Sequence, residues 1–535
     1  MRQPRTVPPV SNKTAEDNSF WLTLMVVVLG AFAAILNSSS INVALPKLMT
    51  IFGVAENEIE WILTAYMLVS GVVIPITGYF SDRFGIKRVY LTGLAIFVVG
   101  SVLCSLSWSN ETMIASRVIQ GIGGGASMPV SMAIVYSIVP RKKIGVALGV
   151  WGMAAVCAPA VGPTLGGYII DHFNWRFLFT MNIPVGVAGL VLSYFLLPEI
   201  PSRGDSKLDL HGVIFSTVGC FTLLLALSQG YSEGWTSQYI VTLFIISAFT
   251  LVMFVIVELG QDQPMLDLSL FKNSIFLISV VIGSIVTIGL FGGVFLIPIF
   301  TQNLMLLTPY QTGLLLMPAA IVTAIMMPVS GFIFDRFGAK LPTLSGLALV
   351  AWGTWKLGTI NLNMSNTTII YYMALRSLGM GLSFMPITAA GMNTVPQHLI
   401  ARASALNNVI RQIAGSLGIA VLTATMQNRQ AFHFARLSEA VSIDSAASSF
   451  LSQVQGYLSS AIAGTSSKAA AVYVLNALVA RESLVQAIDD TFILAAIIII
   501  FSLPLVFFLG KAKPDANPEA HQDIPSNSVT SAPAK

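Results

Sequence analysis

The chain has few charged residues. Asp, Glu, Lys and Arg together make up 10% of its 535 residues, whereas 55% are hydrophobic. A soluble protein would have about 25% charged residues. The composition therefore excludes an ordinary soluble domain and predicts an all-α polytopic membrane protein. The net charge of +4 does not predict nucleic-acid binding, because the basic residues lie between the apolar segments.

Cysteine is also scarce, and the common motifs of enzymes are missing. Cys104, Cys157 and Cys220 all lie inside apolar segments, without the spacing of a metal site. The sequence has no Walker A phosphate loop, no His-Glu-x-x-His motif and no Cys-x-x-Cys motif. We therefore expect no metal, no cofactor, no direct use of ATP and no enzymatic activity.

Long apolar runs fill most of the chain. A helix that crosses the bilayer needs about 20 mainly apolar residues, and only a helix satisfies its own backbone polar groups in lipid. With that length the sequence predicts fourteen spans, at residues 20–45, 60–80, 88–107, 112–138, 144–169, 177–197, 211–230, 238–258, 274–301, 310–333, 341–360, 368–394, 402–427 and 490–510.

The distribution of Lys and Arg predicts the orientation of these spans. Basic residues gather in alternate loops, for example at Arg83, Lys142 and Arg336, whereas the short loops of the other side contain only Lys47 and Arg176. Because basic loops stay inside, we expect both termini in the cytoplasm and the protein in the cell (plasma or inner) membrane. The outer segment 428–489 is predicted to form short amphipathic helices or a hairpin against the outer surface, either as a spacer or as a gate.

An internal repeat predicts the domain organisation. The tetrapeptide Asp-Arg-Phe-Gly occurs at residues 82–85 and again at 335–338, 253 residues later, and each copy follows the second span of its half. Two parallel six-helix bundles with two inserted helices explain this spacing, and a site at the midplane between the bundles suits a transporter. The predicted parts are a cytoplasmic tail (1–19), the first bundle (20–200), the inserted helices (201–262), the second bundle (263–510) and a second cytoplasmic tail (511–535).

The stretch from Gly78 to Arg88 resembles the Gly-x-x-x-Asp-Arg-x-Gly-x-Lys/Arg signature of the major facilitator superfamily. The arrangement of fourteen spans with a long loop before the last one resembles that of the drug:proton antiporter family typified by EmrB and QacA. This resemblance covers residues 20–510. The resemblance implies a conformational latch that stabilises the outward-facing state, whereas a simple basic loop is the alternative. The implied latch residues are Gly78, Asp82, Arg83, Gly85, Arg88, Asp335, Arg336 and Gly338.

Two further segments resemble this family. The segment that begins at Arg117 and includes Gln120 is similar to the fourth-span motif of the family, in which the arginine is implicated in proton transfer. The alternative is an arginine that extends to the outer interface. The fifth span resembles the Gly-Pro-x-x-Gly-Gly antiporter signature, which implies export; ordinary glycine-rich packing is the alternative. The residues of this second motif are Pro159, Gly162, Pro163, Gly166 and Gly167.

The first span departs from the family pattern, because Asn37 stands where the family has an aspartate. An amide does not carry a proton, so the proton carrier is not identified. Buried charges in the spans are basic, which favours neutral, zwitterionic or anionic amphiphiles as substrates. Polar amides in a span usually face the interior. Together with one arginine, they give the predicted substrate pocket of Asn37, Asn42, Gln302, Asn393, Asn407 and Arg411.

The sequence thus predicts a secondary active exporter of drugs or other amphiphiles that works by alternating access and substrate:proton antiport. An exporter without proton coupling, or one coupled to Na⁺, is the alternative that Asn37 leaves open. A sensor or scaffold with the same fold is a third interpretation. The expected partners are the substrate, protons and the lipid bilayer, with a periplasmic adaptor protein as an open case. The expected state is a monomer that does not bind nucleic acid.

Overall fold

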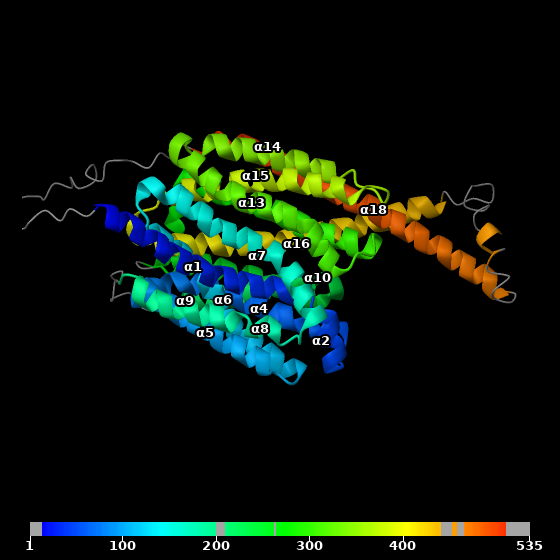
Figure 1. The fold of residues 1–535 in the computed structure, drawn as a ribbon, viewed down its shortest axis with the longest axis horizontal. Helices are drawn as coiled ribbons and strands as arrows, with labels where there is room; N and C mark the ends of the chain where they lie inside the picture. The colour runs from blue at the N-terminus through cyan, green and yellow to red at the C-terminus, as the bar shows by residue number, and fades with distance from the viewer. Residues whose placement is uncertain are drawn as a thin grey trace, which may run out of the picture.

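A computed structural model describes residues 13–199, 209–261, 264–439, 452–455, 457 and 465–509. Over these residues the chain is helical throughout (Figure 1). The expected tail at 511–535 and most of the tail at 1–19 lie outside the described residues. Within the first of these tails, α1 already begins at Lys13.

A helix occupies each of the fourteen predicted spans. The first half contains α1 (Lys13–Ile41), α4 (Trp61–Phe84), α5 (Ile86–Leu106), α6 (Asn110–Ile138), α7 (Ile144–His172) and α9 (Asn182–Leu196). The inserted helices are α10 (Leu210–Glu233) and α11 (Gln238–Gly260). The second half contains α12 (Ser274–Ile299), α13 (Pro309–Phe337), α14 (Lys340–Leu357), α15 (Asn366–Met392), α16 (Ile400–Glu439) and α18 (Thr465–Val506).

Short elements connect these spans. Those between the spans of the first half are α2 (Leu45–Phe52), α3 (Glu56–Ile59), the 3₁₀ turn η1 (Arg141–Lys143) and α8 (Phe177–Thr180). Those next to spans of the second half are the 3₁₀ turns η2 (Leu268–Lys272) and η4 (Gln397–Leu399) and the π-helical segment η3 (Phe300–Leu304).

Length and hydropathy alone do not identify all of these spans. Eleven helices of the described residues are long and apolar enough to cross a membrane, or twelve if the bent α7 is one span. The two that fall short are α14, which has a lysine near each end, and α15, which contains the buried Arg376. Both pack within the second half, α14 against α15 and α18, and α15 also against α13. Their neighbours in the bundle therefore place them among the spans.

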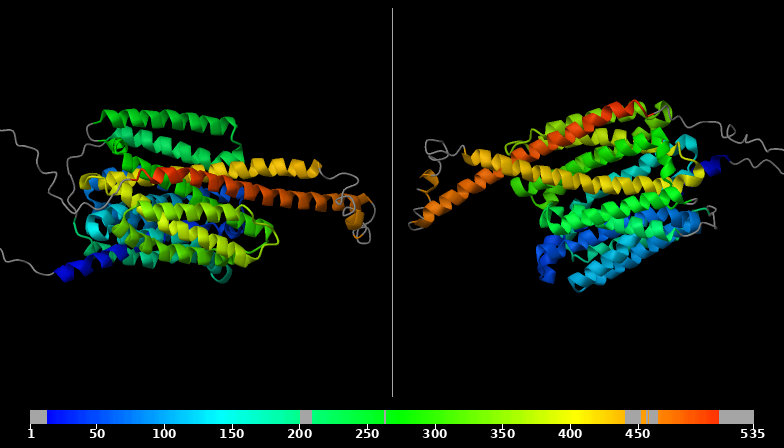
Figure 2. Two further views of the ribbon diagram at one scale, coloured as in Figure 1. Left: turned by 90° about the horizontal axis from the view of Figure 1, so that it is seen from above. Right: turned by 180° about the vertical axis from the view of Figure 1, so that it is seen from behind.

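The two halves meet along two seams. In the α7–α13 seam these two helices pack along their length, and in the α4–α16 seam α4 and α6 of the first half pack against α16. The inserted helix α10 packs against both α4 and α16 and thus covers the second seam, with α11 outside it (Figure 2). The inserted helices therefore lie against both halves.

The ends of the bundle differ, and we name them by their contents. The terminal face contains Phe20 of α1 and the turns at Gly85 and Gly338, both of which have positive φ. The hairpin face is the opposite end, beyond which α16 and α18 project as an antiparallel pair (Figures 1 and 2). With 40 and 42 residues, these helices are about 60 Å long, twice the thickness of the hydrocarbon core.

This projecting hairpin differs from the amphipathic segment expected at 428–489. Most of the described part of that segment, residues 428–439 and 465–489, consists of direct continuations of α16 and α18, which extend away from the bundle instead of lying against its surface (Figure 1). At its base, Arg429 Nε donates to Asp490 Oδ2 at 2.6 Å, and His433 Nε2 lies 2.6 Å from the same oxygen. The remaining residues of the segment lie outside the described part of the chain.

Candidate functional site

At the terminal face, a buried ion pair closes the α4–α16 seam. Arg402 Nε, at the start of α16, donates to Asp82 Oδ2 of α4 at 2.6 Å, and the two side chains are 6% and 9% exposed. The seam is tight here because Gly78 has no side chain. A Cβ at Gly78 would lie 3.2 Å from the Cα of Arg402 and 3.1 Å from the Cβ of Ala405. The first Asp-Arg motif thus contacts a charge of the opposite half.

The second Asp-Arg motif closes the α7–α13 seam in a different way. Asp335 of α13 accepts hydrogen bonds from the backbone N–H groups of Gly145 (3.0 Å) and Val146 (3.2 Å) at the start of α7. A carboxylate is favourable at the N-terminus of a helix, where backbone N–H groups are unpaired. A Cβ at Gly331 would lie 2.1 Å from the carbonyl oxygen of Gly145, so the two backbones touch. The second motif therefore contacts a helix terminus of the other half.

The other residues of these motifs have partners or turn positions within their own half. Arg83 Nη1 donates to the hydroxyl of Tyr79 at 2.8 Å, and Arg336 lies over the ring of Phe337. Arg88 is exposed. Gly85 and Gly338, with φ of +89° and +81°, form the turns after α4 and α13. Such a positive φ favours glycine, which explains the repeated glycine of the tetrapeptide.

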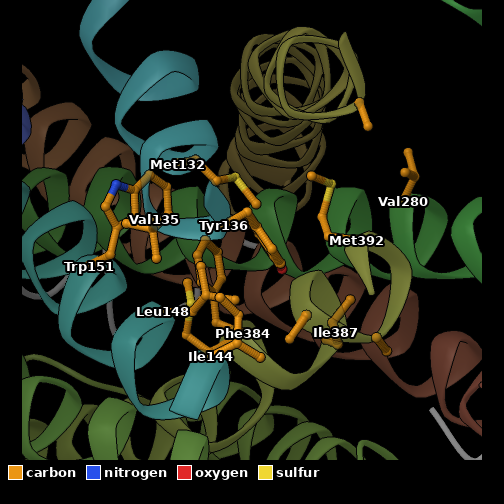
Figure 3. Packing of buried hydrophobic residues seen from close by; sticks show 14 of the residues in the cluster. Met132, Val135, Tyr136, Ile144, Leu148, Trp151, Val280, Phe384, Ile387 and Met392 are labelled. Carbon is orange, nitrogen blue, oxygen red and sulfur yellow. The ribbon is translucent and has the colours of Figure 1, made fainter. Parts of the chain in front are cut away.

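Apolar side chains from both halves fill the space between the two motifs. Figure 3 shows Tyr136 of α6 and Leu148 of α7 near Phe384 of α15, and Trp151 of α7 beside Val135 of α6. All of them are buried. Together with the two aspartate contacts, this cluster closes the terminal face.

Arg411 of α16 lies next to this cluster. Its guanidinium carbon is 4.2 Å from the centre of the Phe384 ring, and its buried Nη1 has no hydrogen-bond partner in the described residues. A cation over an aromatic face is stabilised electrostatically, but it keeps its unused donors. This arginine is therefore available for an acceptor between the halves.

Arg117 is buried in the first half. It is 0% exposed, so it does not extend to the outer interface. Its Nε donates to the Ile62 carbonyl at 3.1 Å, its Nη1 donates to Gln120 Oε1 at 2.6 Å, and the guanidinium stacks on Tyr66. Gln120 Nε2 in turn donates to Ser101 Oγ at 2.8 Å. These partners are neutral groups of the first half.

The fifth-span motif lies in α7, and two of its glycines, Gly162 and Gly166, face α1. The helix bends by 43° between Arg141–Pro159 and Val161–His172. Beyond the bend, a Cβ at Gly162 would lie 3.0 Å from the Ser40 nitrogen, and a Cβ at Gly166 would lie 2.5 Å from the Ser40 carbonyl oxygen. Gly167 faces Tyr310 of α13. The motif thus bends α7 and lets it approach α1 closely.

Towards the hairpin face, the α4–α16 seam opens into a pocket of about 510 Å³. Its walls come from α4, α10, α12 and α16, with one residue each from the loop after α10, from η3 and from α18. At its inner end a Cβ at Gly71 would lie 2.3 Å from Leu224 Cδ1 and 3.7 Å from Gln412 Cγ, so α4, α10 and α16 meet there. The pocket lies on the hairpin side of the seam, away from the two aspartate contacts. It ends at Gly71, where the three helices come close together.

The residues predicted to form a substrate pocket come from both halves, and Asn407 and Arg411 lie one turn apart in α16. Within the part of the chain that the structure describes, Asn37 is 0% exposed and neither of its amide atoms has a hydrogen-bond partner, and the amide nitrogens of Asn393 and Asn407 also have none. Asn42 is exposed on the hairpin side of α1, and Gln302 lies in η3. None of these residues, nor Arg411, lines this pocket at the α4–α16 seam, although Gln412 and Asn303 next to two of them do.

Sequence reasoning missed several residues of this site. No local signal in the sequence shows that Arg402 pairs with Asp82, which lies 320 positions earlier. Trp235 and the inserted helix α10 were not associated with a pocket. The described residues contain no group of three or more His, Cys, Asp or Glu side chains that could hold a metal ion.

The protein consists of two bundles of membrane-spanning helices. They are closed against each other at one face and separated by a pocket towards the other, which is the architecture of a transporter. A model of the Major Facilitator Superfamily matches residues 27–419 of the chain. The protein belongs to the Major Facilitator Superfamily and is a transporter, not an enzyme.

Individual relatives agree with this assignment. The MFS-type transporter YhcA of Bacillus subtilis is 37% identical over 497 residues, which cover 92% of this chain and 93% of YhcA. The multidrug export protein EmrB of Haemophilus influenzae is 31% identical over 81% of this chain and 84% of its own. The solved proton:xylose symporter XylE superposes with a TM-score of 0.59 at 13% identity, over 93% of this chain and 98% of its own, and shows the fold. The resemblance to drug-exporting members of the superfamily is thus confirmed.

Proposed function

We propose that this protein is a secondary active exporter of amphiphilic small molecules, which works by alternating access and exchanges its substrate for protons. The observation that carries the proposal is the asymmetry of the contacts between the halves. Both aspartate motifs join the halves at the terminal face, whereas the pocket lies towards the hairpin face. Relatives named for multidrug export support the direction of transport.

The basic residues support a cytoplasmic terminal face. The turns and helix starts of this face contain Arg88, the run Arg141–Lys143, Lys340 and Arg402. Because basic loops remain in the cytoplasm, the conformation with this face closed is the outward-facing one. In this proposal Asp82 and Asp335 hold the outward-facing state, and opening these two contacts lets substrate enter from the cytoplasm.

Proton coupling is the less direct part of the proposal. Asn37 carries no proton, and Arg117 is surrounded by Gln120, Tyr66 and backbone carbonyls. We propose that Arg117 and Gln120 orient the first half during exchange, and that the unpaired amides and Arg411 contact substrate between the halves when the terminal face opens. An exporter coupled to Na⁺, or not coupled at all, is the second candidate, favoured by Asn37.

Flux measurements in liposomes test this function. The purified protein is reconstituted with a pH-sensitive dye inside the vesicles, and neutral, cationic and anionic amphiphiles are added with and without an imposed pH gradient. Proton antiport predicts that substrate addition drives proton movement and that an uncoupler abolishes accumulation. Substrate movement that is insensitive to the uncoupler and requires Na⁺ would establish the second candidate instead.

A further inference from the structure

Two buried carboxyl groups lie next to each other on the inserted helices. Asp209 is the residue before α10 and is 4% exposed, and Glu258, near the end of α11, is 3% exposed. They converge at Gly212, where an added Cβ would lie 2.2 Å from Asp209 Oδ2 and 3.1 Å from Glu258 Oε1. Neither acid belongs to the repeated Asp-Arg motifs, so the contacts between the halves do not explain why they are buried.

Each carboxyl group has one oxygen without a hydrogen-bond partner in the described residues, Asp209 Oδ2 and Glu258 Oε2. Asp209 Oδ1 accepts from the N–H of Gly212 at 2.9 Å and from Gln261 Nε2 at 3.3 Å, so Asp209 caps α10, where an anion is favourable. Glu258 Oε1 accepts a longer bond, from the N–H of Leu266 at 3.4 Å. Asp209 is thus the better stabilised anion, and Glu258 is the group of this pair that is suited to hold a proton.

The pair has a cation beside it, but that cation already has a partner. Asp209 and Arg402 are the charged groups of the described residues that act on Glu258. Arg402 of α16 is bonded to Asp82 of α4 at 2.6 Å. If all three acids were ionised, three negative charges would surround one positive charge in a buried place. Two carboxylates that share a buried site do not both stay ionised. One proton between Glu258 and Asp209 lowers the excess charge and gives both unpaired oxygens a partner.

We propose that Glu258 and Asp209 share one proton while the terminal face is closed, and that the pair releases this proton to the cytoplasm when the face opens. The helix α10 packs against α4 and α16, so the pair lies beside the ion pair that opening breaks. Once Arg402 and Asp82 separate and water enters, Arg402 becomes the counter-charge of Glu258, whose O–H bond breaks and whose proton passes to water. The inference deepens the proposed function, on which it rests for the orientation of the closed state.

The direction of the pH effect follows from this step. Closing the terminal face takes up one proton, so the closed state gains stability as the pH falls. One proton that is linked to an equilibrium changes it by up to about tenfold per pH unit. Acid in the cytoplasm should therefore favour the closed, outward-facing state, and alkali should favour the open one.

Distances between two spin labels across the terminal face measure this equilibrium. The labels are attached to Arg88→Cys at the start of α5 and Leu341→Cys at the start of α14, both exposed positions, in the full-length protein without its three native cysteines. The distance distribution gives the ratio of open to closed molecules between about pH 5 and about pH 9, the range in which buried carboxyl groups titrate. This ratio should rise with pH, by up to about tenfold per unit.

Three substitutions assign the effect to the pair. Glu258→Gln keeps the shape of the protonated acid and a donor for Asp209, so the protein should stay closed and lose its pH dependence. Glu233→Gln removes an exposed acid at the other end of α10 and is the matched control, which should keep the pH dependence. Asp209→Asn keeps a residue that caps helices but removes one negative charge, so the transition should move to lower pH.

Infrared spectroscopy detects the proton without any opening of the protein. The difference spectrum between the parent and Glu258→Gln in the closed state at low pH should contain the C=O absorption of a protonated carboxyl group. Absence of this band would mean that Glu258 is ionised in the closed state and would overturn the proposal.

Three results of the distance measurement would also overturn it. They are an open fraction that does not depend on pH, an equal pH dependence in the parent and Glu258→Gln, and an open fraction that depends on Na⁺ but not on pH. The last result would assign the pair to Na⁺. Substrate-driven proton flux of the parent in liposomes is measured in parallel. Flux without pH-dependent closing would remove only the role of this pair, whereas pH-dependent closing without flux would remove the antiport and leave the proton site.

Discussion

The ion pair between Asp82 and Arg402 gives a quantitative prediction about the conformational equilibrium. Asp82→Asn leaves the guanidinium of Arg402 in place, 6% exposed, without the carboxylate at 2.6 Å. Removing one partner of a buried ion pair costs about 3–5 kcal/mol. The cost falls on the closed state, because opening the terminal face hydrates Arg402. At 1.4 kcal/mol per tenfold, the equilibrium should shift towards opening by about a hundredfold to a few thousandfold.

Alkylation of a buried cysteine reports this shift. Ser404 of α16 is 0% exposed, and its hydroxyl donates across the seam to the Pro129 carbonyl of α6 at 2.8 Å. In a background without the three native cysteines, Ser404→Cys should react slowly with a maleimide when Asp82 is intact and much faster with Asp82→Asn. Arg88→Gln removes an exposed charge of the same motif and is the matched control.

The exchange of the two charges provides the decisive comparison. Asp82→Arg combined with Arg402→Asp should return the labelling rate towards that of the parent, because the pair is restored with opposite polarity. Equal labelling rates for the parent and Asp82→Asn would refute the reasoning. That result would mean that the apolar cluster and the α7–α13 seam keep the terminal face closed without the ion pair.

Three other changes test separate parts of the site. Gly331→Ala places a methyl group 2.1 Å from the carbonyl oxygen of Gly145, and the backbone there cannot move away easily. Overpacking should therefore lower the free energy of unfolding by about 1–3 kcal/mol and lower the thermal unfolding temperature. An unchanged unfolding temperature would contradict this prediction. Arg117→Lys keeps the charge but loses the planar fork that bonds Gln120 and the Ile62 carbonyl. Since such bonds contribute about 1.5–3 kcal/mol, substrate-driven proton flux should fall about tenfold or more, and an unchanged flux would exclude the proposed role. Asp490→Asn breaks the ion pair with Arg429, whose side chains are 41% (Arg429) and 31% (Asp490) exposed, so it should lower the free energy of unfolding by less than about 1 kcal/mol. Liposome transport within about twofold of the parent would identify the hairpin as a spacer, and a large loss of transport would identify it as a gate.

The fold could be predicted from the sequence because the bilayer restricts what a chain can do. Apolar runs of sufficient length must become helices, and the structure has a helix in each predicted range. The repeated tetrapeptide identified the two halves, and the positive φ of Gly85 and Gly338 explains why glycine recurs there. The helices α14 and α15 fall short on hydropathy, but the sequence still predicted them, because each contains a mainly apolar run of about 20 residues.

The candidate site could be predicted only in part. The sequence marked Asp82 and Asp335 as groups at helix ends that can contact the facing bundle. It did not indicate that the first pairs with Arg402 and the second with the backbone of Gly145 and Val146. The amides chosen for a substrate pocket were selected by polarity alone, and they do not line the pocket at the α4–α16 seam, so their role stays a prediction.

The sequence by itself therefore determined the class of protein, its helices, its duplication and the location of its charged motifs. Each of these depends on the chemistry of neighbouring residues and on the thickness of the bilayer. Only the tertiary structure decided which charges meet across the seams, that α10 and Trp235 wall the pocket, and that α16 and α18 project as a hairpin. These features depend on how helices that are distant in the sequence pack together. The sequence of one helix shows which of its faces is apolar, but not which other helix packs against that face.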